Sequence, residues 1–131
     1  MKPAARILTA HQPAYLPWLG LFHKIALSDI YVFMDNVKFS TSDKFINRNY
    51  IKSDQQKGLR LSVPLKTHGS CNLDISELEV DNGENWQRRH LQSIRQYYAR
   101  SPYGKEYFDQ LGAFYEKKYL HLKDLTFEML N

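Results

Sequence analysis

The sequence predicts an α/β fold: a parallel-containing, Rossmann-like sheet followed by a helical C-terminal part. A short apolar run at residues 7–11 precedes a helix-like pattern and a second apolar run at residues 30–35. A strand, a helix and a strand in this order normally form a right-handed unit whose two strands are parallel. After about residue 85, apolar residues recur every three or four positions, which is typical of amphipathic helices.

The composition is that of a globular chain. With 131 residues, 43% hydrophobic and 24% charged, the chain can bury one core, and we expect a single domain over residues 1–131. No apolar run approaches the length of a membrane span, and the start at Lys2 and Pro3 lacks a signal peptide's apolar stretch. We therefore expect no membrane insertion and a cytoplasmic location. The lone Cys71 agrees with a reducing compartment, and no neighbouring residue marks it as an activated thiol.

The segment between the two apolar runs is a turn that leads into a helix. Pro13 and Pro17 shape this turn, because proline fixes φ and removes a backbone donor. The next apolar residues predict a helix over about residues 18–27, with its apolar face on the sheet. The residues of that face are Leu19, Phe22, Ile25 and Ala26.

The middle of the chain predicts a loop and short strands. Residues 36–49 are polar and irregular, as loops over binding sites commonly are. Residues 48–53 and 59–65 look like strands, and the second shows the alternation of a half-buried strand. Residues 75–80 form another alternating segment that ends in a turn. Its expected buried residues are Ile75, Leu78 and Val80.

The last third of the chain predicts three helices. Asn85 is the expected N-cap of the first, and Ser101 with Pro102 should end it and begin the second. Aromatic residues on both helices, His90 among them, are expected to belong to the core. A third pattern starts at His121 and meets no stop signal. We expect residues 122–131 to expose apolar side chains and to be the helix least protected from hydrogen exchange.

Polar side chains gather where the two parallel strands should end. Ligands of parallel sheets bind at that edge, and His11 is the predicted catalytic residue there, as a phosphate donor or a general acid and base. The alternative is a histidine that ties the turn to the sheet. Gln12 and Tyr15 are predicted ligand donors or turn stabilisers. Asp35 and Asn36 are predicted to bind ribose, sugar hydroxyls or magnesium, or else to form an Asx turn.

The charge distribution suggests an anionic ligand. The net charge of +4 is modest, but basic residues concentrate at residues 38–66, either as a solvated face or as a funnel for an anion. Within this segment Asn47, Arg48 and Asn49 place a guanidinium between two amides, which suits a carboxylate or phosphate. The expected partner is a nucleotide or nucleotide-sugar, without a strong nucleic-acid signal. No His or Cys spacing typical of metal ligands occurs, and the residues do not specify a cofactor.

Several segments resemble one family of bacterial proteins. They are HQPAYLPWLGLFHKIALSDIYVFMDNVKFS, NRNYIK, LSVPLK, VDNGENWQRRHLQSI and RSPYGKEYF, in this order along nearly the whole chain. Together they resemble the WbqC-like family, for which the HQPxYLPWLG motif is specific. The resemblance implies a role near O-antigen and other surface-polysaccharide genes, and attachment of an acyl or aminoacyl group to an amino sugar would suit that context. Family members are longer, so the chain is expected to be the N-terminal portion of a longer architecture.

A more distant likeness concerns nucleotidyltransferases and pantothenate synthetase. In those enzymes a strand leads into a turn with an H-x-G-H motif, whose histidines stabilise the phosphates of a bound nucleotide. The layout here is similar, with His11 before the turn and Gly20 and His23 after it. The H-x-G-H spacing itself is absent, because two residues separate Gly20 from His23.

Two classes of function stay open. The first is a transferase that binds a nucleotide or nucleotide-sugar at the ends of the first two strands and transfers a group to a sugar in surface-polysaccharide synthesis. The second is a non-catalytic binding or partner subunit of the same pathway.

Overall fold

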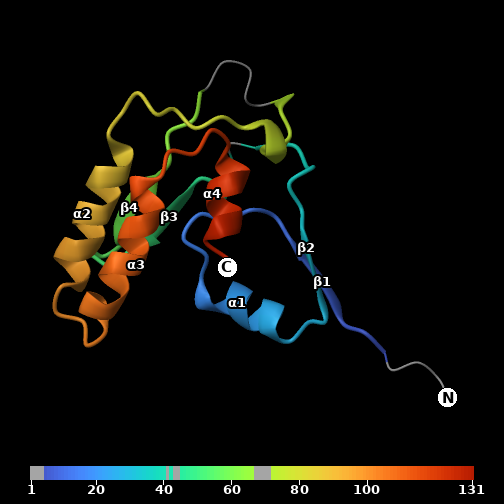
Figure 1. The fold of residues 1–131 in the computed structure, drawn as a ribbon, viewed down its shortest axis with the longest axis horizontal. Helices are drawn as coiled ribbons and strands as arrows, with labels where there is room; N and C mark the ends of the chain where they lie inside the picture. Colours follow the sequence, from blue (N-terminus) through green and yellow to red (C-terminus); the bar gives the residue numbers. More distant parts are fainter. Residues whose placement is uncertain (1–4, 41, 43–44, 67–71) are drawn as a thin grey trace.

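The computed structural model describes residues 5–40, 42, 45–66 and 72–131, and shows a mixed α/β fold in which helices accompany two small sheets. The elements in chain order are β1 (Leu8–His11), α1 (Leu19–Ala26), β2 (Ile30–Phe33), β3 (Arg48–Ile51), β4 (Leu59–Ser62), the 3₁₀ helix η2 (Ile75–Glu77), α2 (Trp86–Tyr98), α3 (Gly104–Glu116) and α4 (Leu122–Glu128). Figure 1 shows β1 and β2 on one side of the molecule and α2 and α3 on the other, with α4 between them and α1 below α4.

The predicted parallel pairing of the first two strands is confirmed. β1 and β2 are parallel neighbours with His11 opposite Phe33, and the Met34 amide donates to the His11 carbonyl over 2.9 Å. The strands are not the buried ones that their apolar sequence predicts, since Leu8 is 61% and Ile30 is 41% exposed. Among the described residues the pair has no third strand, so a Rossmann-like sheet is not confirmed.

Helix α1 lies where it was predicted, but its predicted apolar face is wrong. Leu21 is its buried residue, whereas Leu19 is 83% exposed and Phe22 is also exposed. A two-stranded sheet offers little surface against which a helix can bury a face. The helix therefore leaves much of its apolar surface open to solvent.

The second sheet is an antiparallel hairpin of β3 and β4, shorter than the predicted strands. Arg48 lies opposite Ser62, and Ile51 opposite Leu59. Gly58, just before β4, has φ of 74°, and a Cβ there would come within 2.6 Å of the Ile51 carbonyl oxygen. Glycine is therefore needed at this position for the loop to close.

The alternating segment predicted at residues 75–80 is extended only at its end, where Glu79 and Val80 form isolated bridges with His121 and Leu65. Residues Ile75 to Glu77 form η2, and the capping box between Asp74 and Glu77 satisfies the backbone at its start, with the Asp74 amide donating to Glu77 over 2.8 Å. This local bonding competes with an extended conformation. The predicted burial of Ile75, Leu78 and Val80 is confirmed.

The helical part begins and divides almost as predicted. Helix α2 starts directly after Asn85, although the Asn85 side chain makes no capping hydrogen bond. The second helix was predicted to start at Ser101 and Pro102 but starts at Gly104. The reason is that the Ser101 hydroxyl donates to the Tyr98 carbonyl over 2.8 Å, so it closes α2 instead of capping α3.

Helix α4 is part of the core, which corrects the expectation that residues 122–131 are poorly packed. Leu122, Leu125 and Thr126 are fully buried, and only the outer side of the helix exposes an apolar residue of size, Phe127. Figure 1 shows α4 in the middle of the molecule. Burial on this scale predicts strong protection of its amides from hydrogen exchange.

The residues that lie outside the described ranges include Cys71, and Asp43 and Lys44 of the basic segment. Within the described residues, no helix has the length and apolar character needed to span a membrane.

Candidate functional site

A small pocket lies at the carboxyl end of β1, where the sequence places the site. Its volume is about 160 Å³. It is lined by His11, Gln12, Pro13, Ala14, Trp18, Phe45 and Ile46. Apart from the imidazole and the amide, the lining is apolar or aromatic, so two polar groups define the chemistry of the pocket.

The His11 imidazole is held in one tautomer. Its Nδ1 atom lies 2.7 Å from the carbonyl oxygen of Gln12. A carbonyl oxygen only accepts hydrogen bonds, so Nδ1 carries the proton of the neutral ring and Nε2 is left as an acceptor. The indole of Trp18 packs edge-on against the ring, with centroids 5.1 Å apart and an interplanar angle of 69°.

A strained turn carries these groups. Leu16 has φ of 47°, a left-handed conformation that is unusual for a branched residue, and it precedes Pro17. The Asn49 amide holds this conformation by donating to the carbonyls of Tyr15 and Leu16 over 3.2 and 2.7 Å. Strain of this kind persists only when the surrounding structure fixes it, and it concentrates at functional sites.

Gly20 allows Trp18 to take its place beside the pocket. A Cβ atom at position 20 would lie 2.7 Å from Nε1 of the Trp18 indole. Any other residue there would push the indole aside. Gly20 therefore positions Trp18, although Gly20 does not itself line the pocket.

Tyr15 lies in the core, away from the pocket. Its fully buried hydroxyl is 2.7 Å from Nδ1 of His90 and 2.6 Å from the hydroxyl of Tyr115. Burial, followed by the neighbouring Tyr115, raises the pKa of Tyr15 well above its usual value. Its hydroxyl is committed to the core, which corrects its prediction as a ligand donor.

His90 is the core histidine that the sequence predicts. It is buried between Tyr15 and Trp86, and burial is the main reason that its pKa falls to about 4, with Arg89 adding to the effect. It is therefore neutral at pH 7. The sequence gives no local signal for the Tyr15–His90–Tyr115 network, because its members are 75 and 100 residues from Tyr15.

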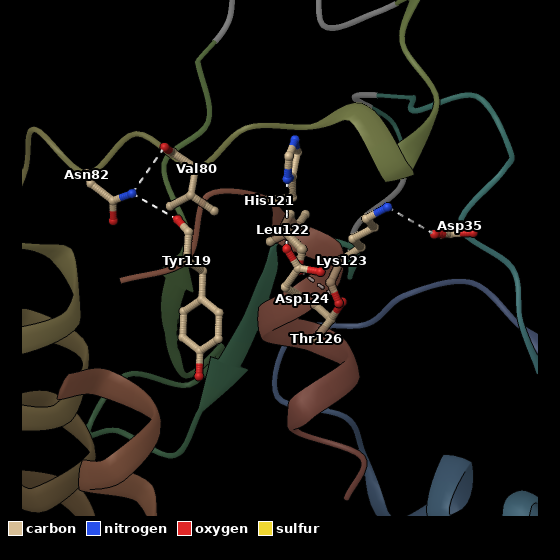
Figure 2. Close-up of polar contacts among 9 residues, drawn as sticks. All are labelled: Asp35, Val80, Asn82, Tyr119, His121, Leu122, Lys123, Asp124 and Thr126. Carbon is tan, nitrogen blue, oxygen red and sulfur yellow. Dashed lines mark hydrogen bonds and ion pairs between the residues drawn. The ribbon is translucent and has the colours of Figure 1, made fainter. Parts of the chain in front are cut away.

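Asp35 and Asn36 share the sheet edge with His11 but not the pocket. Asp35 follows β2 by two residues, and its carboxylate lies 3.9 Å from the Lys123 ammonium of α4 (Figure 2). Its carbonyl accepts a hydrogen bond from the Ser76 amide over 2.8 Å. Asn36 is exposed. The Lys123 contact was not predicted, since no pattern in the sequence links α4 to β2.

Other contacts in Figure 2 fix the start of α4. The Asn82 side-chain amide donates to the Tyr119 carbonyl over 2.9 Å. Outside the figure, the Leu122 backbone amide donates to the Leu78 carbonyl over 2.9 Å. The Thr126 hydroxyl bonds back to the Leu122 carbonyl. These bonds hold Lys123 within reach of Asp35.

The predicted cluster of Asn47, Arg48 and Asn49 does not converge on one ligand position. The Asn47 amide donates to the Val63 carbonyl over 3.0 Å, and Asn49 is occupied by the turn at Leu16. Successive strand residues face opposite sides, so Arg48 in β3 does not share the face of Asn49. The two amides therefore serve the fold in this structure.

Over residues 5–40, 42, 45–66 and 72–131, no three His, Cys, Asp or Glu side chains are grouped so that they could hold a metal ion.

The chain belongs to the WbqC-like protein family, whose model matches residues 12–131. Among curated proteins it is similar to the uncharacterized protein Rv1507c of Mycobacterium tuberculosis, with 31% identity over 122 residues. That match covers 92% of this chain and 51% of the relative, so the chain spans about half the length of the relative. No solved structure matches. The distant likeness to nucleotidyltransferases is not shown by these findings.

Proposed function

We propose that the protein acts in bacterial surface-polysaccharide (O-antigen) synthesis in the cytoplasm, where it binds a nucleotide or nucleotide-sugar at the His11 pocket and transfers a group to a sugar. Membership of the WbqC-like family supports the pathway. The pocket at the end of β1 supports the location of the site, because ligands of parallel strands bind at that edge.

The observation that carries the proposal is the fixed tautomer of His11. With Nδ1 bonded to the Gln12 carbonyl over 2.7 Å, Nε2 is the basic atom of the neutral ring. As the hydroxyl oxygen or amine nitrogen of the acceptor sugar bonds to the transferred group, the bond from that group to the nucleotide phosphate breaks and the nucleotide leaves with its phosphate. The acceptor loses a proton in the same step. His11 Nε2 would accept that proton as the general base.

The neighbouring residues would orient the ligand. The Gln12 side chain offers both a donor and an acceptor at the pocket wall, and Trp18 offers an aromatic edge and face. Asp35 and Asn36, at the same sheet edge, would contact sugar hydroxyls of a ligand that extends beyond the small pocket. Arg48 would add a positive charge near the ligand without entering the pocket.

Calorimetry with a panel of uridine, thymidine and guanosine diphosphate sugars tests binding. We expect at least one to bind, Trp18→Ala to weaken it about tenfold, and the control His23→Ala on exposed α1 to leave it unchanged. With that donor and an amino-sugar acceptor, mass spectrometry should show a product whose formation slows about 10² to 10⁴-fold in His11→Ala, with binding largely kept. Failure of every panel member to bind would refute the proposal.

A non-catalytic partner subunit is the second candidate, and exposed apolar surface favours it. Leu8, Ile30 and Val32 on the parallel strands are all at least 40% exposed. Such surface is commonly covered by another chain or segment. In this alternative, added strands would complete a Rossmann-like sheet at the β1–β2 edge. A bound donor that is never turned over, with His11→Ala silent in every assay, would favour this candidate.

A further inference from the structure

An apolar pocket with a wall of aromatic residues lies apart from the His11 pocket. Its volume is about 340 Å³, within the range of small-molecule sites. It lies where the end of β3 meets the C-terminal end of α2 and the start of α3, and Ile51, Ile94 and Phe108 are among its lining residues. We propose that this pocket binds an uncharged apolar chain, of the kind that an acyl group presents. The proposal does not depend on the function assigned to the His11 pocket.

The lining carries no charge. None of its eleven residues is Asp, Glu, Lys, Arg or His, although 24% of the whole chain is charged. A phosphate or carboxylate inside this pocket would lose its hydration without gaining a cationic partner, which costs several kcal/mol. The pocket therefore selects against anions and matches a neutral group.

Two of the polar side chains in the wall already make a hydrogen bond within the protein. The Tyr98 hydroxyl accepts the Lys52 amide over 3.0 Å, and the Ser101 hydroxyl donates to the Tyr98 carbonyl over 2.8 Å. A sugar needs directional partners for its hydroxyls, and these two groups have less hydrogen-bonding capacity left to offer. Aliphatic and aromatic surface is what the wall offers a ligand, and its burial favours an apolar chain.

The rim of the pocket suits a ligand that is apolar at one end and solvated at the other. Tyr50, Tyr103 and Tyr107 line the pocket and are each about half exposed or more. Tyrosine presents an apolar ring and a polar tip, so it is common where one end of a ligand stays in water. Gly104 allows the start of α3 to lie close to the end of α2, because a Cβ there would meet the Tyr98 carbonyl oxygen at 2.5 Å. This close packing maintains the shape of the pocket.

The pocket is adjacent to the His11 pocket along the chain. Leu16 lines the apolar pocket, whereas Ala14 and Trp18, each two residues away, line the other. The segment from Ala14 to Trp18, which contains the strained turn at Leu16, thus contributes residues to both pockets. The apolar pocket by itself predicts binding of the apolar chain alone.

Amide NMR titration with 1-butanol, 1-hexanol and 1-octanol tests the proposal. We expect saturable shifts of the Gly104 amide with little change at Gly20, and an affinity that rises about fourfold per added methylene. Tyr107→Ala, at the exposed rim, should weaken 1-octanol binding at least fivefold. The control Leu120→Ala, exposed and outside the pocket, should change it less than twofold.

Three results would overturn the proposal: no saturable shift at Gly104, an affinity that does not grow from butanol to octanol, or tighter binding of methyl glucoside than of 1-octanol. A loss of octanol binding in Leu120→Ala equal to that in Tyr107→Ala would also contradict it. Because none of these probes is a nucleotide-sugar, the outcome is separate from that of the His11 pocket.

Discussion

The β1–α1–β2 unit and the core around α2 and α4 differ in how far they bury their apolar residues. In the core, Trp86, Leu122 and Leu125 are fully buried. In the β1–α1–β2 unit, Leu8 and Leu19 are largely exposed. The candidate pocket at His11 belongs to the thinly packed unit, so its shape depends on the contacts that join the two regions.

Aromatic side chains make two of the contacts that join the regions. Tyr15, from the turn after β1, is fully buried among core residues and bonds to His90 and Tyr115. Phe127 of α4 packs edge-on against Phe33 of β2, with ring centroids 5.3 Å apart. Stability therefore resides in the core, while the geometry of the site is set by a few residues that contact both regions.

The largest expected difference between the regions is in free energy of unfolding. Trp86→Ala should lower it by about 3 to 5 kcal/mol, because it empties a fully buried site. The matched truncation Leu8→Ala, on exposed β1, should cost less than about 1 kcal/mol. Urea unfolding of both variants measures this. Equal losses would show that β1 is as well packed as the core.

The next effect is a pH dependence that originates in the core. His90 has a folded-state pKa of about 4 against an ordinary value of 6.5, so the unfolded chain binds more protons between these values. The contribution of neutral His90 to the free energy of unfolding is complete above pH 6.5. It is lost as the pH falls towards 4, by about 3 kcal/mol in total. Urea unfolding at pH 7, 6, 5 and 4 measures it.

The variants of this experiment separate the two regions. His90→Gln should flatten the slope between pH 6.5 and 4, whereas His23→Gln on exposed α1 should keep it. A slope that survives in His90→Gln would assign the pH dependence to other groups.

The link between the regions gives a smaller effect. Tyr15→Phe removes a hydroxyl shared by His90 and Tyr115 and leaves both without that partner, so it should cost about 1 to 3 kcal/mol. Tyr115→Phe keeps the Tyr15–His90 bond and should cost less. Thermal unfolding of the two variants compares them. A larger loss in Tyr115→Phe would contradict the central place of Tyr15.

The smallest effects on stability are expected from two glycine substitutions, one of which should also alter the site. Gly112→Ala, in the interior of α3 where an added Cβ would meet only Arg95 Nη2 at an ordinary 3.9 Å, should stabilise the protein by up to about 1 kcal/mol. Gly20→Ala should gain nothing, since its methyl displaces Trp18. The indole N–H signal of Trp18 in the nitrogen–proton NMR spectrum should shift in Gly20→Ala alone. An unchanged spectrum would remove Gly20 as a positioning residue.

Local patterns predicted most of the fold, and long-range contacts account for the corrections. The parallel pairing of β1 with β2 followed from a strand, helix and strand in order, and the burial of Ile75 and Leu78 followed from their spacing. The exposure of α1 did not, because burial depends on how wide the neighbouring sheet is. The packing of α4 was missed because its partners lie far away in the chain.

The candidate site shows the same division. His11 and Gln12 line a pocket where a parallel strand ends, as the motif position predicts. The core role of Tyr15 and the use of Asn49 to hold Leu16 could not be predicted, because each partner is more than 30 residues away. Residue type alone does not show whether a polar group faces a ligand or the fold.

The most direct test of the site is the tautomer of His11, observed by nitrogen NMR of the imidazole rings with and without a nucleotide-sugar. We expect neutral His11 to carry its proton on Nδ1. A bound nucleotide-sugar should shift the signals of the His11 nitrogens and not those of exposed His23. A His11 ring protonated on Nε2, or one that no member of the panel perturbs, would contradict it.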